Sequence, residues 1–437
     1  MYQRNTELIT GIIVGAGHRG IAYASYAEQH PDEFKIVGIA DPWEQRRNQV
    51  AQRFGIPPER RYESADALAA APKFADIAIN ATMDALHVPT TLPLLAAGYD
   101  VLLEKPFAVN ENELRQLVQA TRTFKRKVVI CHLLRYIPFY VAIREKILEG
   151  AIGDILNIQT IEHVSYHHIA VAYLRGKWRS KKIGGSSMLM AKCCHDLDLI
   201  AWLKSGIAPT AVSSFGSNFQ FSPEKAPKGS GKRCMVDCQI EADCLYSARK
   251  HYIDHPDRWA FYAWESLEHL ENPGIEDKIR SLKTDNPYGK CVWKCDHDVV
   301  DHQSVIIEFE DGSTASHNMI GGTAKPSRAI HLIGTRGEIQ GSLDENKFIL
   351  RGIDPRPGKE YTETVIDLNL DRDAAGSNDG HAGGDMRLVA DFLHVINGEP
   401  YSICTTHLED SINGHIIGFY ADKAMEQQCV LAIPKID

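Results

Sequence analysis

Short apolar runs alternate with helix-like segments along the first third of the chain. The runs lie at residues 8–15, 35–41, 75–82, 99–106 and 127–134. Continuous apolar runs that alternate with helices are typical of βαβ units, whose parallel sheet is covered by helices on both faces. Residues 1–131 are therefore predicted to form an α/β domain around an open parallel sheet.

The pattern changes beyond this point. Segments such as 155–168 and 327–343 are rich in β-branched residues and are bounded by turn-forming residues, which favours antiparallel hairpins. We predict that residues 132–437 form a second, α+β domain with a large, mostly antiparallel open sheet. Within this domain, residues 216–300 carry Pro, Gly, Cys and Trp with no clear period and are interpreted as a Cys-rich insertion.

Composition and charge narrow the class of protein. The 437 residues carry 48 basic and 57 acidic side chains, so the net charge is −9. A nucleic-acid-binding protein usually has a basic excess, which this chain lacks, and no apolar run is long enough to span a membrane. The N-terminal apolar stretch leads into glycines rather than into a signal-peptide cleavage site. A cytoplasmic protein with neither nucleic acid nor membrane as a partner is predicted.

Half of the 10 cysteines lie between residues 234 and 295. Cys234, Cys238, Cys244 and Cys291 could supply the four ligands of a structural zinc site. Their spacing is not C-x-x-C, however, and a long gap separates Cys244 from Cys291. Buried free thiols are the alternative, and the one that we favour for a protein of a reducing compartment.

A glycine motif follows the first predicted strand. Gly15, Gly17 and Gly20 match G-x-G-x-x-G and open a predicted helix. In a dinucleotide site the first glycine permits a tight turn, the second lets the pyrophosphate approach the backbone, and the third allows helix and strand to pack closely. The N–H groups at the start of the helix attract the phosphates. A glycine turn with no ligand is the alternative.

Asp41 ends the second predicted strand, roughly 20 residues after the last glycine, where a carboxylate can accept hydrogen bonds from the ribose hydroxyls of NAD. Arg46 and Arg47 follow closely and could instead neutralise the 2′-phosphate of NADP. We favour NAD, because the acceptor stands at the strand end whereas the arginines lie on the next helix.

Lys105, within Glu104-Lys105-Pro106, ends the fourth predicted strand. Open α/β sheets bind ligands at this edge, and a cationic amine there can polarise a substrate hydroxyl or carbonyl. A solvated turn lysine is the alternative.

His195 lies on a predicted helix within residues 184–203, with Lys192 and Asp196 on the same face and Asp198 close by. An imidazole, whose pKa is near neutral, suits acid/base chemistry in the oxidation of an alcohol. A hydrogen-bonded core histidine is the alternative.

These residues resemble those of the Gfo/Idh/MocA family of NAD(P)-dependent oxidoreductases. The matching pieces are GAGHRG with Asp41, then ATMDALHVPTTLPLLAAGYDVLLEKP, then the stretch from the glycine pair to His195 and Asp198, and together they span most of residues 8–204. The resemblance implies an N-terminal Rossmann domain and a C-terminal α/β domain whose open sheet often makes oligomer contacts, so that a homodimer or homotetramer is expected.

The resemblance also implies residue roles. Lys105 takes the family's catalytic or substrate-binding lysine role, and His195 that of the catalytic histidine. The cofactor-binding residues that it implies are Gly15, Gly17, His18, Arg19, Gly20, Asp41, Thr82, His87, Glu104 and Lys105.

One position departs from the family. Many members place an aspartate four residues before the catalytic histidine, and Ala191 stands there in this chain. We name Lys192 as a third catalytic candidate, because it can supply the missing polar function. A cation at this position would suit an oxyanion, or a carboxylated or sulfated substrate.

Residues 163–180 concentrate His, Tyr, Arg and Trp just before the histidine helix. Aromatic faces stack on sugar rings, and a guanidinium binds hydroxyls or acids. The substrate-binding candidates are His168, Tyr173, Arg175 and Trp178. A salt-bridged surface loop is the alternative for each of them. His381, in a glycine-rich loop, is a candidate lid residue.

The predicted function is an NAD-dependent oxidoreductase that transfers a hydride between a secondary alcohol of a sugar, glycoside or cyclitol and the nicotinamide. NADP is the less favoured cofactor. Two alternatives stay open: an NAD-dependent glycosidase that acts by transient oxidation and elimination, and a non-enzymatic dinucleotide-sensing regulator.

Overall fold

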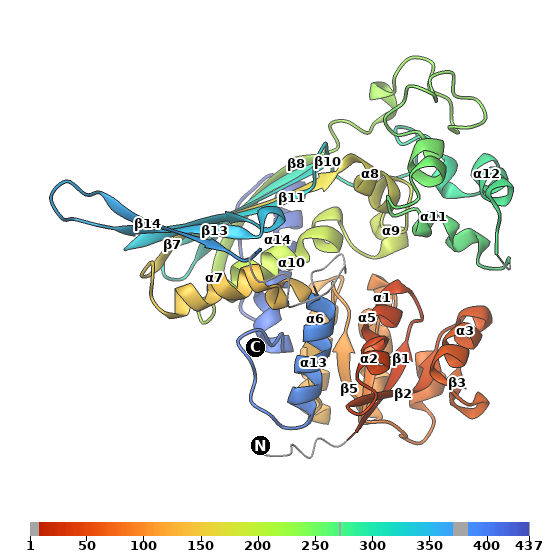
Figure 1. Cartoon of the computed structure of the whole chain (residues 1–437), viewed down its shortest axis with the longest axis horizontal. Coiled ribbons are helices and arrows are strands. Elements are labelled where there is room, and N and C mark those ends of the chain that lie inside the picture. Colours follow the sequence, from red (N-terminus) through yellow and green to blue (C-terminus); the bar gives the residue numbers. More distant parts are fainter. Residues whose placement is uncertain (1–7, 271, 370–382, 437) are drawn as a thin grey trace.

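The structure, a computed structural model, describes residues 8–270, 272–369 and 383–436, and it contains two sheets (Figure 1). The first sheet has six parallel strands in the order β3-β2-β1-β4-β5-β6. This strand order is that of a dinucleotide-binding Rossmann fold. The strands are β1 (Ile9–Val14), β2 (Phe34–Ala40), β3 (Arg61–Tyr62), β4 (Ile77–Asn80), β5 (Asp100–Leu103) and β6 (Val128–Ile130).

Helices connect these strands, because each buried strand must be reached by a crossover. The predicted alternation of strand and helix is confirmed. The helices are α1 (His18–Ala24), α2 (Tyr26–Gln29), α3 (Glu44–Phe54), α4 (Ala65–Ala69), α5 (His87–Ala96) and α6 (Glu111–Phe124).

The second sheet has nine strands in the order β14-β13-β12-β11-β7-β10-β9-β8-β15. All neighbours are antiparallel except β7 and β10, which confirms the predicted mostly antiparallel sheet. The strands are β7 (Ile155–Ser165), β8 (Pro209–Ser217), β9 (His302–Phe309), β10 (Thr314–Thr323), β11 (Ser327–Gly334), β12 (Gly337–Ser342), β13 (Lys347–Ile353), β14 (Tyr361–Asp367) and β15 (Leu431–Ala432).

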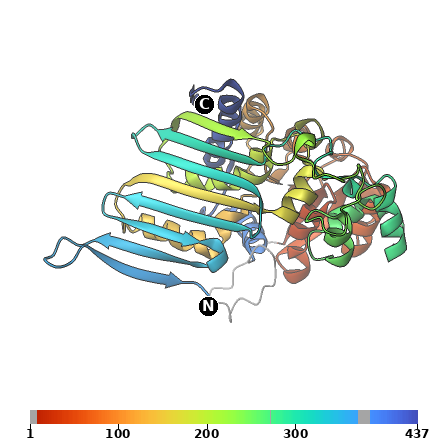
Figure 2. The same ribbon diagram turned by 90° about the horizontal axis from the view of Figure 1, so that it is seen from above.

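Helices cover one face of this second sheet. They are α7 (Pro138–Leu148), α10 (Met188–Leu203) and α14 (Leu408–Gln427). Figure 2 shows the other face open. Strand β9 alternates accordingly: Val305 and Ile307 are buried while Ser304 and Ile306 are exposed, as expected for a strand with one wet face.

A helix from late in the chain lies against the first domain. Helix α13 (Gly384–Ile396) packs beside α1. The Arg19 guanidinium forms a 2.6 Å ion pair with Asp385, and the Lys127 ammonium donates to the carbonyl of Val395 at 2.5 Å. The two domains are therefore joined by more than one pass of the chain.

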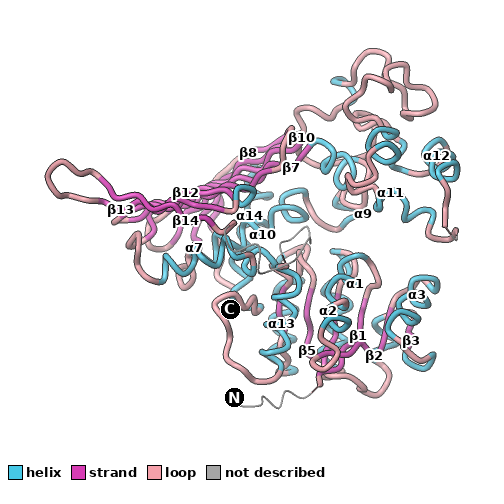
Figure 3. Tube along the Cα trace, viewed as in Figure 1, coloured by secondary structure: helices cyan, strands magenta, loops and turns pink. Residues whose placement is uncertain are grey.

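Residues 218–301, here called the insertion, leave the second sheet after β8 and return at β9, so that they interrupt a pair of adjacent strands. Loops dominate the insertion (Figure 3). Its helical pieces include the π-helical turn Lys250–Asp254, α11 (Phe261–Trp264), the 3-10 turn Glu265–Leu267 and α12 (Ile275–Lys283). Of the helices that the structure describes, none is both long and apolar enough to cross a membrane.

Candidate active site

A cavity of about 180 Å³ lies where the carboxyl ends of β4 and β5 meet α10 and the insertion. It brings together ten of the residues predicted from the sequence. These are Arg19, Thr82, His87, Glu104, Lys105, His168, Tyr173, Trp178, Lys192 and His195. The remaining lining includes Asp84, Arg328, Trp259 and Tyr262, which the sequence had not indicated.

The glycine loop forms the cofactor end of the site. Gly15 has φ +90°, and a Cβ there would stand 2.7 Å from the carbonyl oxygen of Ala81. A Cβ on Gly20 would clash with the carbonyl oxygen of Gly15, whereas one on Gly17 would meet no atom within 4 Å. Gly15 and Gly20 are thus required by packing, and Gly17 leaves open space where a pyrophosphate can approach the backbone. These residues fit a dinucleotide.

Asp41 joins this loop to the end of β2. Its buried carboxylate accepts hydrogen bonds from the N–H of Ala16 at 2.7 Å and from the N–H of Trp43 at 2.8 Å. Each carboxylate oxygen retains a further lone pair for a ribose hydroxyl. Arg47 donates to the carbonyl oxygen of Asp41 at 2.6 Å, and Arg46 is held by the insertion.

Lys105 lies just beyond the end of β5 and reaches across the cavity. Its ammonium donates to the carbonyl oxygen of Ala191, on α10, at 3.0 Å. Beside it, the Glu104 carboxylate accepts from the Arg19 guanidinium at 2.8 Å and from the hydroxyl of Tyr23 at 2.9 Å. Glu104 therefore fixes the glycine loop, while the Lys105 amine is presented to the cavity.

Helix α10 presents His195 to the same cavity. The Ser187 side chain caps the helix by accepting from the N–H of Met190 at 3.1 Å. His195 is 7% exposed, and its ring centroid lies 5.6 Å from that of the fully buried His132. Burial holds the pKa of His132 well below its usual value, so this neighbour is neutral.

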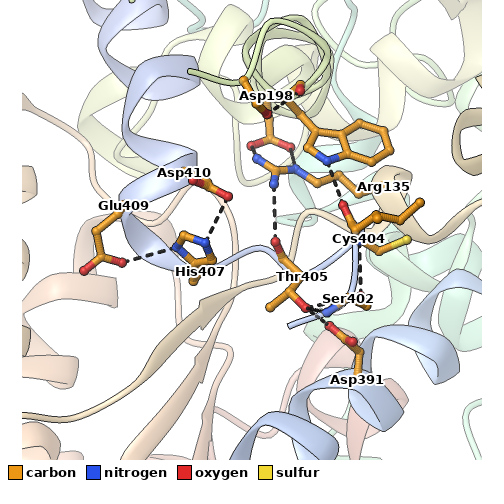
Figure 4. A network of polar contacts seen from close by, with 12 residues as sticks. Arg135, Asp198, Asp391, Ser402, Cys404, Thr405, His407, Glu409 and Asp410 are labelled. Carbon is orange, nitrogen blue, oxygen red and sulfur yellow. Dashed lines mark hydrogen bonds and ion pairs between the residues drawn. The ribbon is translucent and has the colours of Figure 1, made fainter. Parts of the chain in front are cut away.

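Asp198, one turn further along α10, points away from the cavity. Its carboxylate binds the Arg135 guanidinium through two hydrogen bonds of 2.6 and 2.7 Å (Figure 4). Arg135 also donates to the carbonyl oxygen of Thr405 at 3.4 Å. Because Arg135 and Asp198 are both buried, this pair anchors the histidine helix rather than taking part in chemistry.

Lys192 belongs to a balanced cluster of four charges in the wall of the cavity. Its ammonium lies 2.9 Å from a Glu162 oxygen. Arg328 bridges Glu162, at 2.5 Å, and Asp196, at 3.0 Å. Burial by itself would lower the pKa of Arg328, but Asp196 and Glu162 raise it well above its usual value. Two cations are thus offset by two carboxylates.

Aromatic rings form a further part of the cavity wall. The His168 ring stacks on Trp259 at a centroid distance of 4.5 Å and an angle of 15°. Trp178 meets Tyr262 edge-on at 6.1 Å, and its indole N–H donates to the buried Asp84 carboxylate at 3.1 Å. Burial raises the pKa of Asp84, an effect that His87 and Lys105 oppose.

Trp259 and Tyr262 come from the insertion, which has no hydrophobic period to place them. The one signal in the sequence is the density of rings in WAFYAW, residues 259–264. Trp259 also has φ +60°, a left-handed conformation that is uncommon for a bulky residue.

The structure places Arg175 outside the cavity, which corrects its expected role as a substrate ligand. Arg175 is 1% exposed, and its guanidinium donates to the carbonyl oxygens of Lys290 and Tyr246 and to the hydroxyl of Tyr252. All these partners lie in the insertion, so Arg175 holds the insertion to the preceding segment. Candidate lid residue His381 lies outside the described residues.

The zinc site is likewise not supported. Within the described residues, one group of three or more metal-ligand side chains gathers within 4.8 Å, namely Cys193, Asp196 and His317. It contains none of the four cysteines proposed as ligands, Cys234, Cys238, Cys244 and Cys291. All four are free, and Arg175 donates to the Cys234 sulfur at 3.4 Å. Burial raises the pKa of the Cys244 and Cys291 thiols, which favours the protonated form over a ligating thiolate.

Two family models match this chain. The model described as "Oxidoreductase family, NAD-binding Rossmann fold" matches residues 9–132, and the "GFO/IDH/MocA C-terminal domain" matches residues 140–245. The protein YteT of Bacillus subtilis is 23% identical over 373 residues, which cover 84% of this chain and 83% of YteT. The trans-1,2-dihydrobenzene-1,2-diol dehydrogenase of Mus musculus is 34% identical over 144 residues, but these cover 33% of this chain and 42% of the mouse protein.

Among solved structures, levoglucosan dehydrogenase in complex with NADH and levoglucosan is similar to this chain with a TM-score of 0.68 and 16% identity. The match covers 98% of this chain and 100% of that one. At this level of identity the likeness shows a shared fold. Together with the family models, it supports NAD as the cofactor that the glycine loop and Asp41 accommodate.

Proposed function

The chain belongs to the GFO/IDH/MocA family of NAD-binding oxidoreductases, and from this premise we propose that it oxidises a secondary alcohol of a sugar, glycoside or cyclitol with NAD. The observation that carries the proposal is the convergence of Lys105 and His195 on one cavity at the carboxyl edge of the dinucleotide sheet. An amine and an imidazole beside a nicotinamide site are the groups that alcohol oxidation requires.

Each residue has a defined task in this mechanism. Lys105 donates a hydrogen bond to the substrate oxygen and stabilises negative charge as the hydroxyl loses its proton. His195, the general base, accepts that proton. The nicotinamide, when bound, supplies the acceptor for the hydride of the carbinol carbon. Trp178 and Trp259 exclude water and orient the ring, because a flat aromatic face stacks on the apolar face of a sugar.

A neutral polyol suits the charge distribution better than an acid. Lys192, which the sequence suggested as an anion ligand, is paired with Glu162, and Arg328 is paired with Glu162 and Asp196. Among the relatives and structural neighbours, the dihydrobenzenediol and levoglucosan are neutral, whereas the UDP-GlcNAcA bound by the WlbA dehydrogenase is acidic. If an acidic substrate is used instead, Lys192→Met will lower kcat/KM for carboxylated or sulfated sugars and leave neutral sugars unaffected.

The test is a panel of cyclitols, free sugars, anhydrosugars and glycosides incubated with the purified protein and NAD. Absorbance at the NADH band and product analysis are followed together. Stoichiometric NADH and a keto product support the dehydrogenase. Release of an aglycone with no net NADH would instead indicate the glycosidase, in which transient oxidation acidifies a neighbouring C–H bond. NAD binding with no turnover of any compound would indicate the regulator.

We also propose that the protein is a homo-oligomer assembled through the open face of the second sheet. Phe215, Ile306 and Ile320 are 70%, 55% and 42% exposed and lie on this face of adjacent strands. Light scattering of the wild type and of Ile306→Glu tests this proposal, and a monomeric wild type would refute it.

The ten free cysteines fit the predicted cytoplasmic location.

A further inference from the structure

The insertion contacts the adenosine side of the cofactor site as well as the substrate cavity. The ring of His18, in the glycine loop, lies 4.5 Å from Phe261 and 5.7 Å from Tyr262 between centroids. Glu265 forms a 2.8 Å ion pair with Lys177 and approaches His18 to 3.8 Å. Residues 259–268 therefore contact both the glycine loop and the segment that precedes α10.

The same segment binds the start of α3, which follows β2 and Asp41. Glu268 holds the Arg46 guanidinium in a two-pronged hydrogen bond of 2.8 and 2.9 Å. The Gln45 side chain donates to the backbone carbonyl of Glu268. Arg46 is 20% exposed, and a Glu265 oxygen lies 4.0 Å from it. Burial would lower the pKa of Arg46, but the carboxylate of Glu268 raises it, so the arginine stays charged and paired.

This position matters for cofactor choice. In dinucleotide-binding domains, the 2′-hydroxyl of NAD binds an acid at the end of the second strand, and an arginine nearby accommodates the 2′-phosphate of NADP. This chain has both features: the acid is Asp41, and the nearby arginines are Arg46 and Arg47. Arg47 donates through one nitrogen to the carbonyl oxygens of Asp41 and Pro42, at 2.6 and 3.0 Å, and its guanidinium lies 3.9 Å from Glu63. Arg46 is the guanidinium of the two that the insertion holds.

We propose that Glu268 determines cofactor specificity, by neutralising Arg46 and holding its fork away from the 2′-position of the ribose. A guanidinium that is already hydrogen-bonded to a carboxylate cannot bind a phosphate in the same way unless two charge-assisted hydrogen bonds are broken. The preference for NAD over NADP is then set by two carboxylates, Asp41 from the sheet and Glu268 from the insertion. This inference rests on dinucleotide binding at the glycine loop.

The test measures equilibrium binding, which does not depend on turnover or on the substrate. Dissociation constants for NAD and NADP are measured by calorimetry, together with those for AMP and adenosine 2′,5′-bisphosphate, which probe only the adenosine end. Glu268→Gln is expected to tighten binding of the 2′-phosphorylated ligands about tenfold, because the Arg46 guanidinium loses its two charge-assisted hydrogen bonds to a carboxylate. NAD and AMP should bind within about twofold of the wild type, since Asp41 is unchanged.

Three further variants keep the inference falsifiable. Glu276→Gln removes an exposed carboxylate elsewhere in the insertion and should change the affinity for neither NAD nor NADP. Arg46→Met alone should leave the ratio of NADP to NAD affinity unchanged, because the arginine is already occupied. In the double variant Arg46→Met/Glu268→Gln, the gain in NADP affinity should disappear.

The outcomes separate the two proposals. If Glu268→Gln keeps the wild-type melting temperature and NAD affinity but gains no affinity for the 2′-phosphorylated ligands, the specificity role of Glu268 is wrong while the dehydrogenase proposal stands. A gain that persists without Arg46 overturns the role of the arginine. Failure of the wild type to bind either dinucleotide overturns the proposed function itself.

Discussion

The two walls of the cavity are built in different ways. Lys105 and Glu104 follow β5, and Thr82 follows β4, so the parallel sheet places them together at one edge. Trp259 and Tyr262 come from a segment of loops and short helices that has no repeating pattern. The sheet wall carries the Lys105 amine and the glycine loop, whereas the insertion wall carries rings and carboxylates that we expect to contact ligands without reacting.

We expect this difference to separate the chemical step from recognition of the substrate. The residues of the sheet wall follow strands whose positions are fixed by hydrogen bonds to their neighbours, so this wall can hold reacting groups in fixed positions. Loops tolerate substitution and insertion far better than sheets do. Changes in the insertion should therefore alter which substrate and which dinucleotide bind, and changes on the sheet side or on α10 should alter the rate of the chemical step.

The largest effect is expected for His195→Asn. Loss of the general base should lower kcat by roughly 10³-fold, within the range that acid/base groups contribute. NADH affinity, followed by fluorescence, should stay unchanged because the glycine loop is intact. His255→Asn, an exposed histidine of the insertion, is the matched control. A loss of NADH binding in His195→Asn would mean that the histidine supports structure rather than catalysis.

The anchor of the histidine helix ranks second. Asp198→Asn leaves the Arg135 guanidinium buried without its carboxylate, which should lower the free energy of unfolding by about 3–5 kcal/mol. Chemical denaturation measures this loss. The surface variant Asp32→Asn should change stability by less than about 0.5 kcal/mol. If the two variants are equally stable, the Arg135–Asp198 pair does not hold α10 in place.

On the insertion wall, Trp259→Ala should raise KM for the sugar about tenfold and leave kcat within about threefold, because a stacking partner is lost while the reacting groups stay in place. Steady-state kinetics with the best substrate of the panel check this. Trp264→Ala removes a ring of the same segment that does not line the cavity and is the control. A fall in kcat comparable to that of His195→Asn would break the division between the two walls.

The smallest effect concerns His407, which precedes α14 and bridges the edge strand β6 through Val129. Hydrogen bonds with Asp410 and Glu409 (Figure 4) raise the pKa of His407 to about 9. This pKa is above the usual value of about 6.5. The contribution of these contacts to the free energy of unfolding is therefore fully present below pH 6.5 and is lost as the pH rises toward 9.

His407→Gln should therefore remove a decline in stability between pH 6.5 and 9. Both acids are about half exposed, so the effect should be about 1 kcal/mol or less. Urea denaturation at several pH values measures it, with the exposed His269→Gln as control. An unchanged pH profile would show that these contacts contribute nothing to stability.

Much of the sheet side could be predicted from the chain. The glycine motif, Asp41 and Lys105 stand at strand ends, and the order of strands in such a fold brings those ends together. The insertion side could not be predicted, because its loops have no hydrophobic periodicity, and without one the spacing of residues in the sequence does not indicate their positions in space. Arg175 shows the difficulty: an arginine among aromatic residues looks like a substrate ligand, and only its buried partners reveal that it ties the insertion down.

The sequence by itself determined the fold class and the dinucleotide motif, since these follow from hydrophobic period and from motifs whose spacing is local. It named Lys105 and His195 only as candidates, and the structure brings these two side chains to one cavity. The tertiary structure decided that Lys192 is balanced by Glu162, that Asp198 faces Arg135, and that Glu268 occupies Arg46. Each of these is an ion pair between residues that are distant in the chain, and Coulomb attraction depends on separation in space, which only the packed domains fix.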